Sequence, residues 1–363
     1  TQREFRLYLE EMHGLGVLVR RTDERIAVRS PNVVSMLGKK ADLEQQLEEG
    51  RFELPHDYNP RASRRLVRIR QRLVRSPLTE QDLRILLPKT GGSPGLHLVL
   101  GSEALGIDHV VDVLGAVATE RDRATVSVKA ASFADWVTSS GAGPARDRDT
   151  VPLVDATGAD DGDAERVLEL AMRTVSRRAG QSIIVVLGAA FAAHLESWSS
   201  RAGVASVTTL VRLNDEALRS MNEAVFVDIA QYRSQILEAT NGWPALVEQV
   251  LLSGSKGEPL DSILDSLGSQ PSDASASTAF LKGVGVGVDG LGERLADWVD
   301  ATSPGDRVDP RDLDELYADA PPGTFSSIAA TLAVLDAVTG EAPTLLLDPV
   351  VRRAVRSTLD AGD

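Results

Sequence analysis

Between residues 96 and 213, short apolar runs alternate with longer segments in which apolar residues recur every three or four positions. The short runs predict strands that are buried on both faces, and the longer segments predict amphipathic helices. The predicted order is strand Leu96–Leu100, helix Ile107–Thr119, strand Thr125–Val128, strand Val151–Val154, helix Ala164–Arg178, strand Ile183–Leu187, helix Ala190–Ser199 and strand Val207–Val211. Because buried strands that alternate with helices form parallel sheets, we predict an α/β core.

The N-terminal segment has a helix followed by a hairpin in its pattern. Residues Glu4–Met12 predict the helix, and two alternating runs that begin at Val17 and Arg25 predict the hairpin. Ser30-Pro31-Asn32 then begins a short helix. This order is that of the last part of a winged helix, so we expect the chain, which begins at Thr1, to be a fragment of a larger protein.

The C-terminal segment repeats part of this pattern. Residues 252–278 are rich in Ser, Gly and Asp and predict a linker. Helices are predicted at Leu291–Val299, Pro310–Tyr317 and Thr324–Val338, followed by a strand at Thr344–Leu347 and by Asp348-Pro349-Val350-Val351. Because strand, proline and paired valines recur as they do after the first hairpin, we predict a second winged helix.

The loop after the first core strand has glycines at the spacing of a phosphate-binding loop. Gly101 and Gly106 stand five positions apart, and the next two residues are Ile107 and Asp108. A working loop has Lys there to reach the β- and γ-phosphates and then Ser or Thr to hold Mg²⁺. Neither an isoleucine nor a carboxylate performs these roles, so we predict an eroded phosphate loop that binds no nucleotide.

A second position in the core also lacks an expected group. Asp155 ends the strand Val151–Val154, where a carboxylate of a nucleotide-hydrolysing sheet holds Mg²⁺ through water, but the next residue is Ala156 in place of the Glu that polarises water. Two interpretations of Asp155 stay open, because an Asp at a strand end also caps the following turn.

A tight corner between two predicted helices follows the core. Asn241-Gly242 ends the helix Gln235–Thr240, and Trp243 precedes Pro244, which begins the next helix. This corner resembles the Gly-x-Pro corner in the helical lid of STAND-class NTPases, which are regulatory relatives of AAA+ ATPases. The strand 207–211 with Arg212 after it also resembles the junction between core and lid in that family, and the resemblance covers about Leu96–Leu251.

The resemblance implies a fold class and a division of the chain. The fold class is α/β, with a parallel-sheet P-loop-NTPase-like core and a helical lid, plus N- and C-terminal winged-helix domains that are mostly α. The expected parts are a partial winged helix with a helical extension (1–58), an arginine-rich linker helix (59–78), the degenerate core (79–213), the lid (214–256), and a linker with the C-terminal winged helix (257–363).

Charge is distributed unevenly along the chain. The net charge is −14, yet residues 1–75 carry 16 Lys and Arg against 11 Asp and Glu, which leaves the remainder strongly acidic. Seven arginines lie between Arg61 and Arg75. They predict either a packed or solvated helix or DNA contacts, for which the candidates are Arg61, Arg64, Arg65, Arg68 and Arg72. Because an acidic surface repels phosphate backbones, only residues 1–75 are candidates for binding DNA.

Composition excludes several other kinds of site. The longest apolar run, Ile183–Ala193, has eleven residues and is too short to cross a bilayer. The chain has no Cys, and His13, His56, His97, His109 and His194 do not have ligand spacing, so no metal site is expected. No signal peptide is recognisable, and we predict a cytoplasmic protein without membrane contact. No catalytic residues and no cofactor are predicted.

Residues 285–290, Gly-Val-Gly-Val-Asp-Gly, match a dinucleotide-binding fingerprint in their letters. They do not match its context, because no buried strand precedes them and no β-α-β unit follows. We therefore expect a glycine-rich break between two helices.

Three functions are compatible with the sequence. The first is a non-catalytic, STAND-like scaffold or sensor module of a larger bacterial ATPase, which the resemblance places in signalling or antiviral defence and conflict. Its partner would be another protein or the missing N-terminal ATPase portion of the same protein. The second is a DNA-binding winged-helix module of an origin-recognition-like AAA+ ATPase. The third is a nucleotide-binding enzyme with an unorthodox site.

Overall fold

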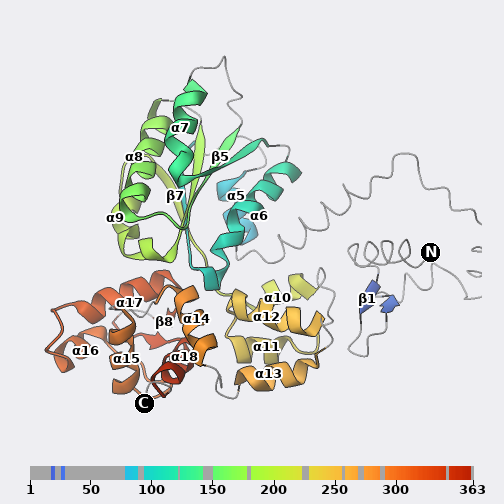
Figure 1. The fold of residues 1–363 in the computed structure, drawn as a ribbon, viewed down its shortest axis with the longest axis vertical. Coiled ribbons are helices and arrows are strands. Elements are labelled where there is room, and N and C mark those ends of the chain that lie inside the picture. The colour runs from blue at the N-terminus through green and yellow to red at the C-terminus, as the bar shows by residue number, and fades with distance from the viewer. Residues whose placement is uncertain are drawn as a thin grey trace, which may run out of the picture.

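The computed structural model describes residues 18–20, 26–28, 78–88, 94–121, 123–141, 150–177, 181–222, 229–255, 258–268, 274–286, 291–340 and 343–360. A five-stranded sheet, parallel throughout, is its largest feature (Figure 1). The strands are β3 (Gly95–Leu100), β4 (Thr125–Lys129), β5 (Val151–Ala156), β6 (Ser182–Leu187) and β7 (Val204–Thr209). Their spatial order is β4-β5-β6-β3-β7. The core therefore has the α/β, P-loop-NTPase-like fold class that the sequence predicted.

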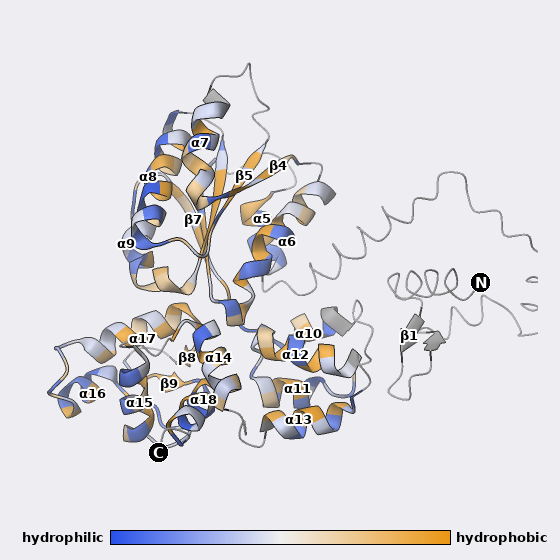
Figure 2. Ribbon diagram, viewed as in Figure 1, coloured by the Kyte–Doolittle hydropathy of each residue, from blue (hydrophilic) through white to orange (hydrophobic). Residues whose placement is uncertain are grey.

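Both faces of the sheet are buried, and alternate residues of each strand supply the two faces. Val99 and Ile184 pack with α5 (Glu80–Leu86) and α6 (Ile107–Glu120) in one apolar core. The neighbouring residues Leu98 and Val185 pack in a second core on the other face. The helices of this second face are α7 (Ala130–Gly141), α8 (Asp161–Arg177) and α9 (Leu195–Ser199). This arrangement explains why the central strands β3, β5 and β6 are almost continuously apolar, as Figure 2 shows for β5.

The strand order creates a switch point in the sheet. The connection from β3 passes through α6 on one face and leads to β4 at one edge. The connection from β6 passes over the opposite face and leads to β7 at the other edge. Where neighbouring connections diverge in this way, a crevice opens beyond the carboxyl ends of the strands, and ligands of α/β proteins bind there.

Two further structural units lie beside each other beyond the carboxyl ends of the strands (Figure 1). The first has its own apolar core and contains α10 (Asp215–Asn222), α11 (Arg233–Thr240), α12 (Pro244–Ser255) and α13 (Leu260–Gly268). We call it the helical unit. The second, the C-terminal unit, contains α14 (Ala274–Val284), α15 (Leu291–Ala301), α16 (Pro310–Leu316), α17 (Thr324–Val334), β8 (Val338–Thr339), β9 (Leu346–Leu347) and α18 (Pro349–Asp360). Its core is continuous with the α6 face of the sheet.

Several local predictions are confirmed. Pro244 is the first residue of α12, as its position after the Asn241-Gly242 corner predicted. Near the N-terminus, β1 (Leu18–Arg20) and β2 (Ile26–Val28) form the expected antiparallel hairpin. The helices expected at 4–12 and 61–75 lie outside the described residues.

Other local predictions are wrong. Residues 252–278 are not a linker, because they include the end of α12, all of α13 and the beginning of α14. The many Ser and Gly residues led to the linker prediction, but the apolar residues between them have helical spacing, and Ile263 and Leu264 are buried. The last core strand is 204–209 instead of 207–211, and the helix expected at 324–338 ends at Val334. Helix α7 was not predicted, and the helix expected at 190–199 begins as the 3-10 helix η2 (Ala189–His194).

Within the part of the chain that is described, no helix combines the length and the apolar character needed to cross a membrane.

Candidate functional site

The loop after β3 is a short, self-contained turn. Ser102 caps the 3-10 helix η1 (Glu103–Leu105) through its side chain, and Gly106 follows in the left-handed conformation. The backbone N–H groups of Leu105 and Ile107 both donate to the Ser102 carbonyl, at 3.0 and 3.1 Å, and that of Gly106 donates to the Glu103 carbonyl at 2.9 Å. A phosphate-binding loop needs such N–H groups to point into the cradle. In this chain they are used within the loop itself.

The four residues predicted to form the eroded phosphate loop are close together but have structural roles. A β-carbon at Gly101 would lie 2.6 Å from Leu210 Cδ1, so close packing against the segment after β7 explains this glycine. Ile107 is 1% exposed and belongs to the core that α6 forms with the sheet. The Asp108 carboxylate is exposed and lies 3.4 Å from His109 Nε2. The loop thus supplies no cation to the crevice.

Asp155 makes local contacts at the end of β5. Its carboxylate accepts from the Lys129 ammonium on β4, from the Thr157 hydroxyl at 2.8 Å and from the Thr157 N–H at 3.2 Å. Burial raises the pKa of Asp155, but these hydrogen bonds to Lys129 and Thr157 together outweigh it, so the net shift is downward. Ala156 points to the opposite face of the sheet and is buried in its core. The contacts with Thr157 match the turn-capping interpretation of Asp155.

The crevice at the switch point has a volume of about 350 Å³. Its lining residues come from the loops after β3, β5 and β6 and from α14: Glu103, Ile107, Asp108, Thr157, Gly158, Gly188, Ala189, Ala190, Lys282, Gly283 and Gly285. Of these residues, Ile107 and Asp108 were predicted from the sequence, whereas Thr157 and Lys282 were not. The Lys282 side chain comes from the C-terminal unit, more than 170 positions after the loop, and no local motif indicated it.

The end of α14 packs directly against the crevice loops. Gly283 lies beside Ala104 of η1, and a β-carbon at Gly285 would collide with the Ala189 β-carbon of η2. Gly285 has a φ of +96°, and the N–H groups of Gly285 and Val286 donate to the Lys282 and Leu281 carbonyls, both at 3.0 Å. This is a Schellman cap, which ends a helix with a left-handed glycine. The first glycine of the fingerprint-like stretch is therefore a helix cap.

These residues do not match the donor set that a magnesium triphosphate requires. The N–H groups of Leu105, Gly106 and Ile107 are already bonded within the loop. Two carboxylates, Glu103 and Asp108, line the crevice with a single lysine. The C-terminal end of α14 also brings the negative end of a helix dipole to the crevice, where a phosphate would need positive potential. Within the described ranges, no group of three or more His, Asp or Glu side chains is placed to hold a metal ion.

A buried network, which we call the joint, connects the sheet with the helical unit and with the C-terminal unit. Its centre is the Asp348 carboxylate, which precedes α18 and is 0% exposed. It accepts from the Arg212 guanidinium after β7, from the Asn241 side-chain amide, and from Trp243 Nε1 at 3.1 Å. Arg212 also bonds Asp336 through its Nε at 3.1 Å and its backbone N–H at 2.7 Å.

The predicted lid corner, Gly242, Trp243 and Pro244, forms part of the joint. Gly242 has a φ of +77°, and its carbonyl accepts from the Leu213 N–H at 2.7 Å. A β-carbon at Gly242 would collide with the Leu213 carbonyl, so the position requires glycine. The Trp243 ring is fully buried, with the Arg212 guanidinium carbon 5.9 Å from its centroid and Phe280 of α14 edge-on at 5.4 Å. The corner thus contacts all three parts of the structure.

The predicted DNA contacts, Arg61, Arg64, Arg65, Arg68 and Arg72, lie outside the described residues.

Comparisons with known proteins find similarity in structure alone. No family model and no curated protein matches the chain. A Walker-type ATPase, PABY2304, of Pyrococcus abyssi aligns with a TM-score of 0.48 and 12% identity over 72% of this chain and 91% of its own. The Thermotoga maritima RuvB Holliday junction branch migration motor aligns at 0.36 and 12% identity over 80% of this chain and 94% of its own. The Aeropyrum pernix ORC1 protein, solved with DNA, aligns at 0.33 and 12% identity over 85% of this chain and 94% of its own. All three TM-scores are below 0.5. The fold is therefore described by the strand order of the sheet itself.

Proposed function

We propose that this chain is a non-catalytic, P-loop-NTPase-like scaffold module of a larger protein. The observation that carries the proposal is the packing of the end of α14 on the crevice loops, through Gly283 and Gly285. In a nucleotide-hydrolysing relative this crevice would hold the phosphates. In this chain the crevice faces the C-terminal unit, so the sheet and its loops serve to join structural units. The STAND-like corner at Gly242 supports placing the parent protein among bacterial signalling or antiviral-defence ATPases.

The C-terminal unit has the element order of a winged helix, and we propose that it is one. Helix α15 is followed by a bridge that pairs Val308 with Leu345, by α16 and α17, and by the antiparallel pair β8 and β9. Helix α17 takes the place of the recognition helix, yet it contains no Lys or Arg and packs against η2 of the core. This combination favours contacts with protein over contacts with DNA.

A binding experiment on the whole chain tests the proposal. We expect millimolar Mg-ATP, Mg-ADP or Mg-GTP to leave the melting temperature unchanged, with no heat of binding in calorimetry and no phosphate release. A nucleotide at 100 times its dissociation constant would stabilise the fold by about 2.7 kcal/mol, which a melting curve detects easily. A saturable stabilisation that disappears in Lys282→Ala would overturn the proposal, because Lys282 would then serve as the missing loop cation.

A second function, DNA binding, is favoured by the composition of residues 1–75 alone, with 16 Lys and Arg against 11 Asp and Glu. The test is fluorescence anisotropy with a labelled duplex at several salt concentrations. The parent chain is compared with a variant in which Arg61, Arg64, Arg65, Arg68 and Arg72 are all Gln. Affinity that falls steeply with salt and is lost in the variant would favour DNA binding. Equal, weak affinity of both chains would favour the scaffold.

A further inference from the structure

A groove at the helical unit is lined by acidic side chains. It lies between α11, α13 and the Arg353 side chain of α18, and its volume is about 350 Å³. We call it the acidic groove. Leu264 at the groove is buried, whereas Glu238, Asp261 and Asp265 are exposed. Its lining residues are Gln235, Glu238, Ala239, Asp261, Leu264, Asp265 and Arg353.

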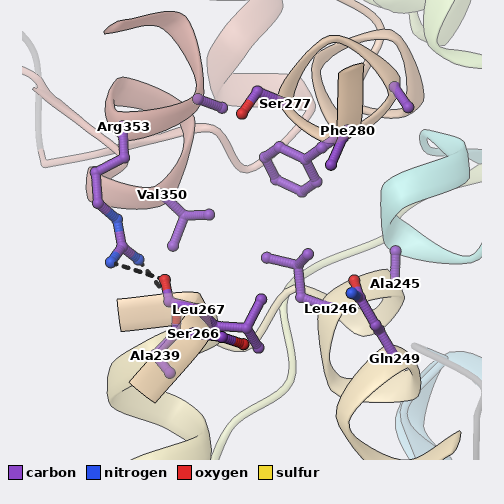
Figure 3. A pocket seen from close by; sticks show the side chains of 13 residues that line it. Ala239, Ala245, Leu246, Gln249, Ser266, Leu267, Ser277, Phe280, Val350 and Arg353 are labelled. Carbon is purple, nitrogen blue, oxygen red and sulfur yellow. Dashed lines mark hydrogen bonds between the residues drawn. The ribbon is translucent and has the colours of Figure 1, made fainter. Parts of the chain in front are cut away.

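The Arg353 guanidinium belongs to the lining of two neighbouring hollows. It donates to the Leu267 carbonyl at 3.3 Å and to the Ala239 carbonyl at 3.0 Å. Figure 3 shows these bonds beside the other hollow, in which Arg353 is the only charged lining residue. Because carbonyl acceptors are neutral, Arg353 keeps its positive charge. The lining of the acidic groove thus combines three carboxylates with one guanidinium, and its net charge is negative.

The helical unit as a whole has an excess of negative charge. Residues 215–222, 229–255 and 258–268 contain seven Asp and Glu against two Arg. Both arginines, Arg219 and Arg233, lie beside the Asp215 carboxylate of α10, at 2.9 and 3.6 Å. The positive charge of the unit is therefore concentrated at α10 and does not balance the acidic groove.

A segment of the opposite charge precedes the core in the same chain. Residues 61–75 contain seven Arg and no Asp or Glu, with Leu, Val and Ile between the arginines. Successive positions three or four apart share one face of a helix. Five of the arginines follow this spacing: Arg61, Arg65, Arg68, Arg72 and Arg75.

We propose that the acidic groove binds the arginine-rich segment 61–75 of its own chain. Asp261 and Asp265 stand one turn apart on α13, as successive arginines of the segment do in sequence. Carboxylates accept paired hydrogen bonds from guanidinium groups, and the aliphatic stems of arginines pack on apolar residues such as Leu264. The segment is joined to the core at the buried Leu78, three positions after Arg75, so its effective concentration at the groove is high.

This contact would give the arginines a partner within the protein. The same arginines include the candidates for DNA contacts, so the acidic groove and a phosphate backbone would compete for them. The inference goes beyond the scaffold function and does not depend on the state of the crevice.

Fluorescence anisotropy with a labelled synthetic peptide of residues 61–75 tests the proposal. The peptide is titrated with the parent chain and with the full-length variant in which Arg61, Arg64, Arg65, Arg68 and Arg72 are all Gln. We expect saturable one-to-one binding to this variant, because its own segment has lost most of its charge and leaves the groove open. Binding to the parent chain should be at least about tenfold weaker, because its tethered segment competes.

Two triple substitutions in the Gln variant locate the binding site. One removes the three carboxylates of the acidic groove, and the matched control removes three exposed carboxylates of the C-terminal unit. The substitutions are Glu238→Gln with Asp261→Asn and Asp265→Asn, and Glu293→Gln with Asp312→Asn and Glu315→Gln. The groove variant should bind the peptide about tenfold more weakly, whereas the control should keep its affinity. Thermal melts by circular dichroism show that both variants are folded.

Three outcomes would overturn the inference. The first is no saturable binding to the Gln variant, and the second is equal affinity of the parent chain and the Gln variant for the peptide. The third is an equal loss in both triple variants, which would indicate general attraction to an acidic chain. None of these outcomes involves a nucleotide, so the scaffold proposal is judged separately.

Discussion

The crevice at the switch point and the joint around Asp348 both contain carboxylates near a cation, but their surroundings differ. The Asp108 side chain at the crevice is 54% exposed, whereas that of Asp348 at the joint is 0% exposed. Asp348 accepts hydrogen bonds from three side chains and from the first backbone N–H groups of α18. Interactions between exposed charges are screened by water, whereas a buried charge is tolerated only when it is fully bonded.

The difference indicates how this chain uses its charged residues. Whereas a phosphate-binding loop directs its N–H groups at a ligand, the loop after β3 bonds to itself through Ser102 and Glu103. The dense bonding is instead at the joint, where Arg212 connects the sheet to the C-terminal unit. We infer that the contact between units has the larger energetic weight, and four substitutions test this comparison.

The largest effect is expected for Arg212→Ala. The change leaves the buried Asp348 and the partly buried Asp336 without their cation, which costs about 3–5 kcal/mol of unfolding free energy. Urea denaturation followed by tryptophan fluorescence measures the loss, and Trp243 reports on the joint directly. The control is Arg294→Ala, whose partners Asp297 and Asp319 are more exposed and whose loss should be much smaller. Similar losses in both variants would contradict the comparison.

Gly285→Ala should have the next largest effect. The residue has a φ of +96° and its new β-carbon would collide with Ala189, so strain and overpacking add to about 2–3 kcal/mol. The matched control is Gly305→Ala, which has a φ of +90° but open space around it and should lose only about 1 kcal/mol. Thermal melts of the two variants measure the difference. If the variants melt together, α14 is not packed on the crevice loops.

Asp155→Asn should destabilise the chain by roughly 1 kcal/mol, and only above acidic pH. The folded pKa of Asp155 is lowered because hydrogen bonds from Lys129 and Thr157 outweigh the effect of burial. A lowered carboxyl pKa contributes stability above the unfolded pKa, and that contribution disappears as the pH falls through the folded pKa. The unfolding free energies of the parent chain and of Asp155→Asn, measured by urea titration from pH 7 downward, should therefore become equal in acid. A constant difference across this range would show that the Asp155 charge contributes nothing.

Asp108→Ala at the crevice should change the unfolding free energy by no more than about 0.5 kcal/mol, because the side chain is exposed. A loss of several kcal/mol in the same urea assay would show that the crevice charges carry structural weight. A substantial gain would indicate that they repel each other, as the charges of a ligand site often do.

Much of the core was predictable because its signals are local. Continuous apolar runs indicated the strands β3, β5 and β6, and Pro244 marked the beginning of α12. The edge strands and the helix 130–141 were less clear, because half-exposed segments such as β4 lack a continuous apolar run. In residues 252–278, small polar residues suggested a linker, whereas α13 within this range buries Ile263 and Leu264.

The candidate site was predictable only in part. The departures at Ile107 and Asp108 are visible in the sequence because a phosphate loop has required residue types at fixed spacing. Lys282 and the Schellman cap at Gly285 were not expected there, because their position depends on how α14 packs against η1 and η2. The role of Asp348 was likewise hidden, although the Asp-Pro pair had been noted.

The sequence by itself determined the order of the core strands, the apolar character of the central strands and the absence of a loop cation at Ile107. Each of these follows from residues within a few positions of one another, where periodicity and motif spacing are informative. The tertiary structure decided that α14 meets the crevice and that Arg212 meets Asp348, which stand 136 positions apart in the chain. Such contacts depend on how whole units pack, because a buried charge finds its partner only after the apolar faces around both have come together.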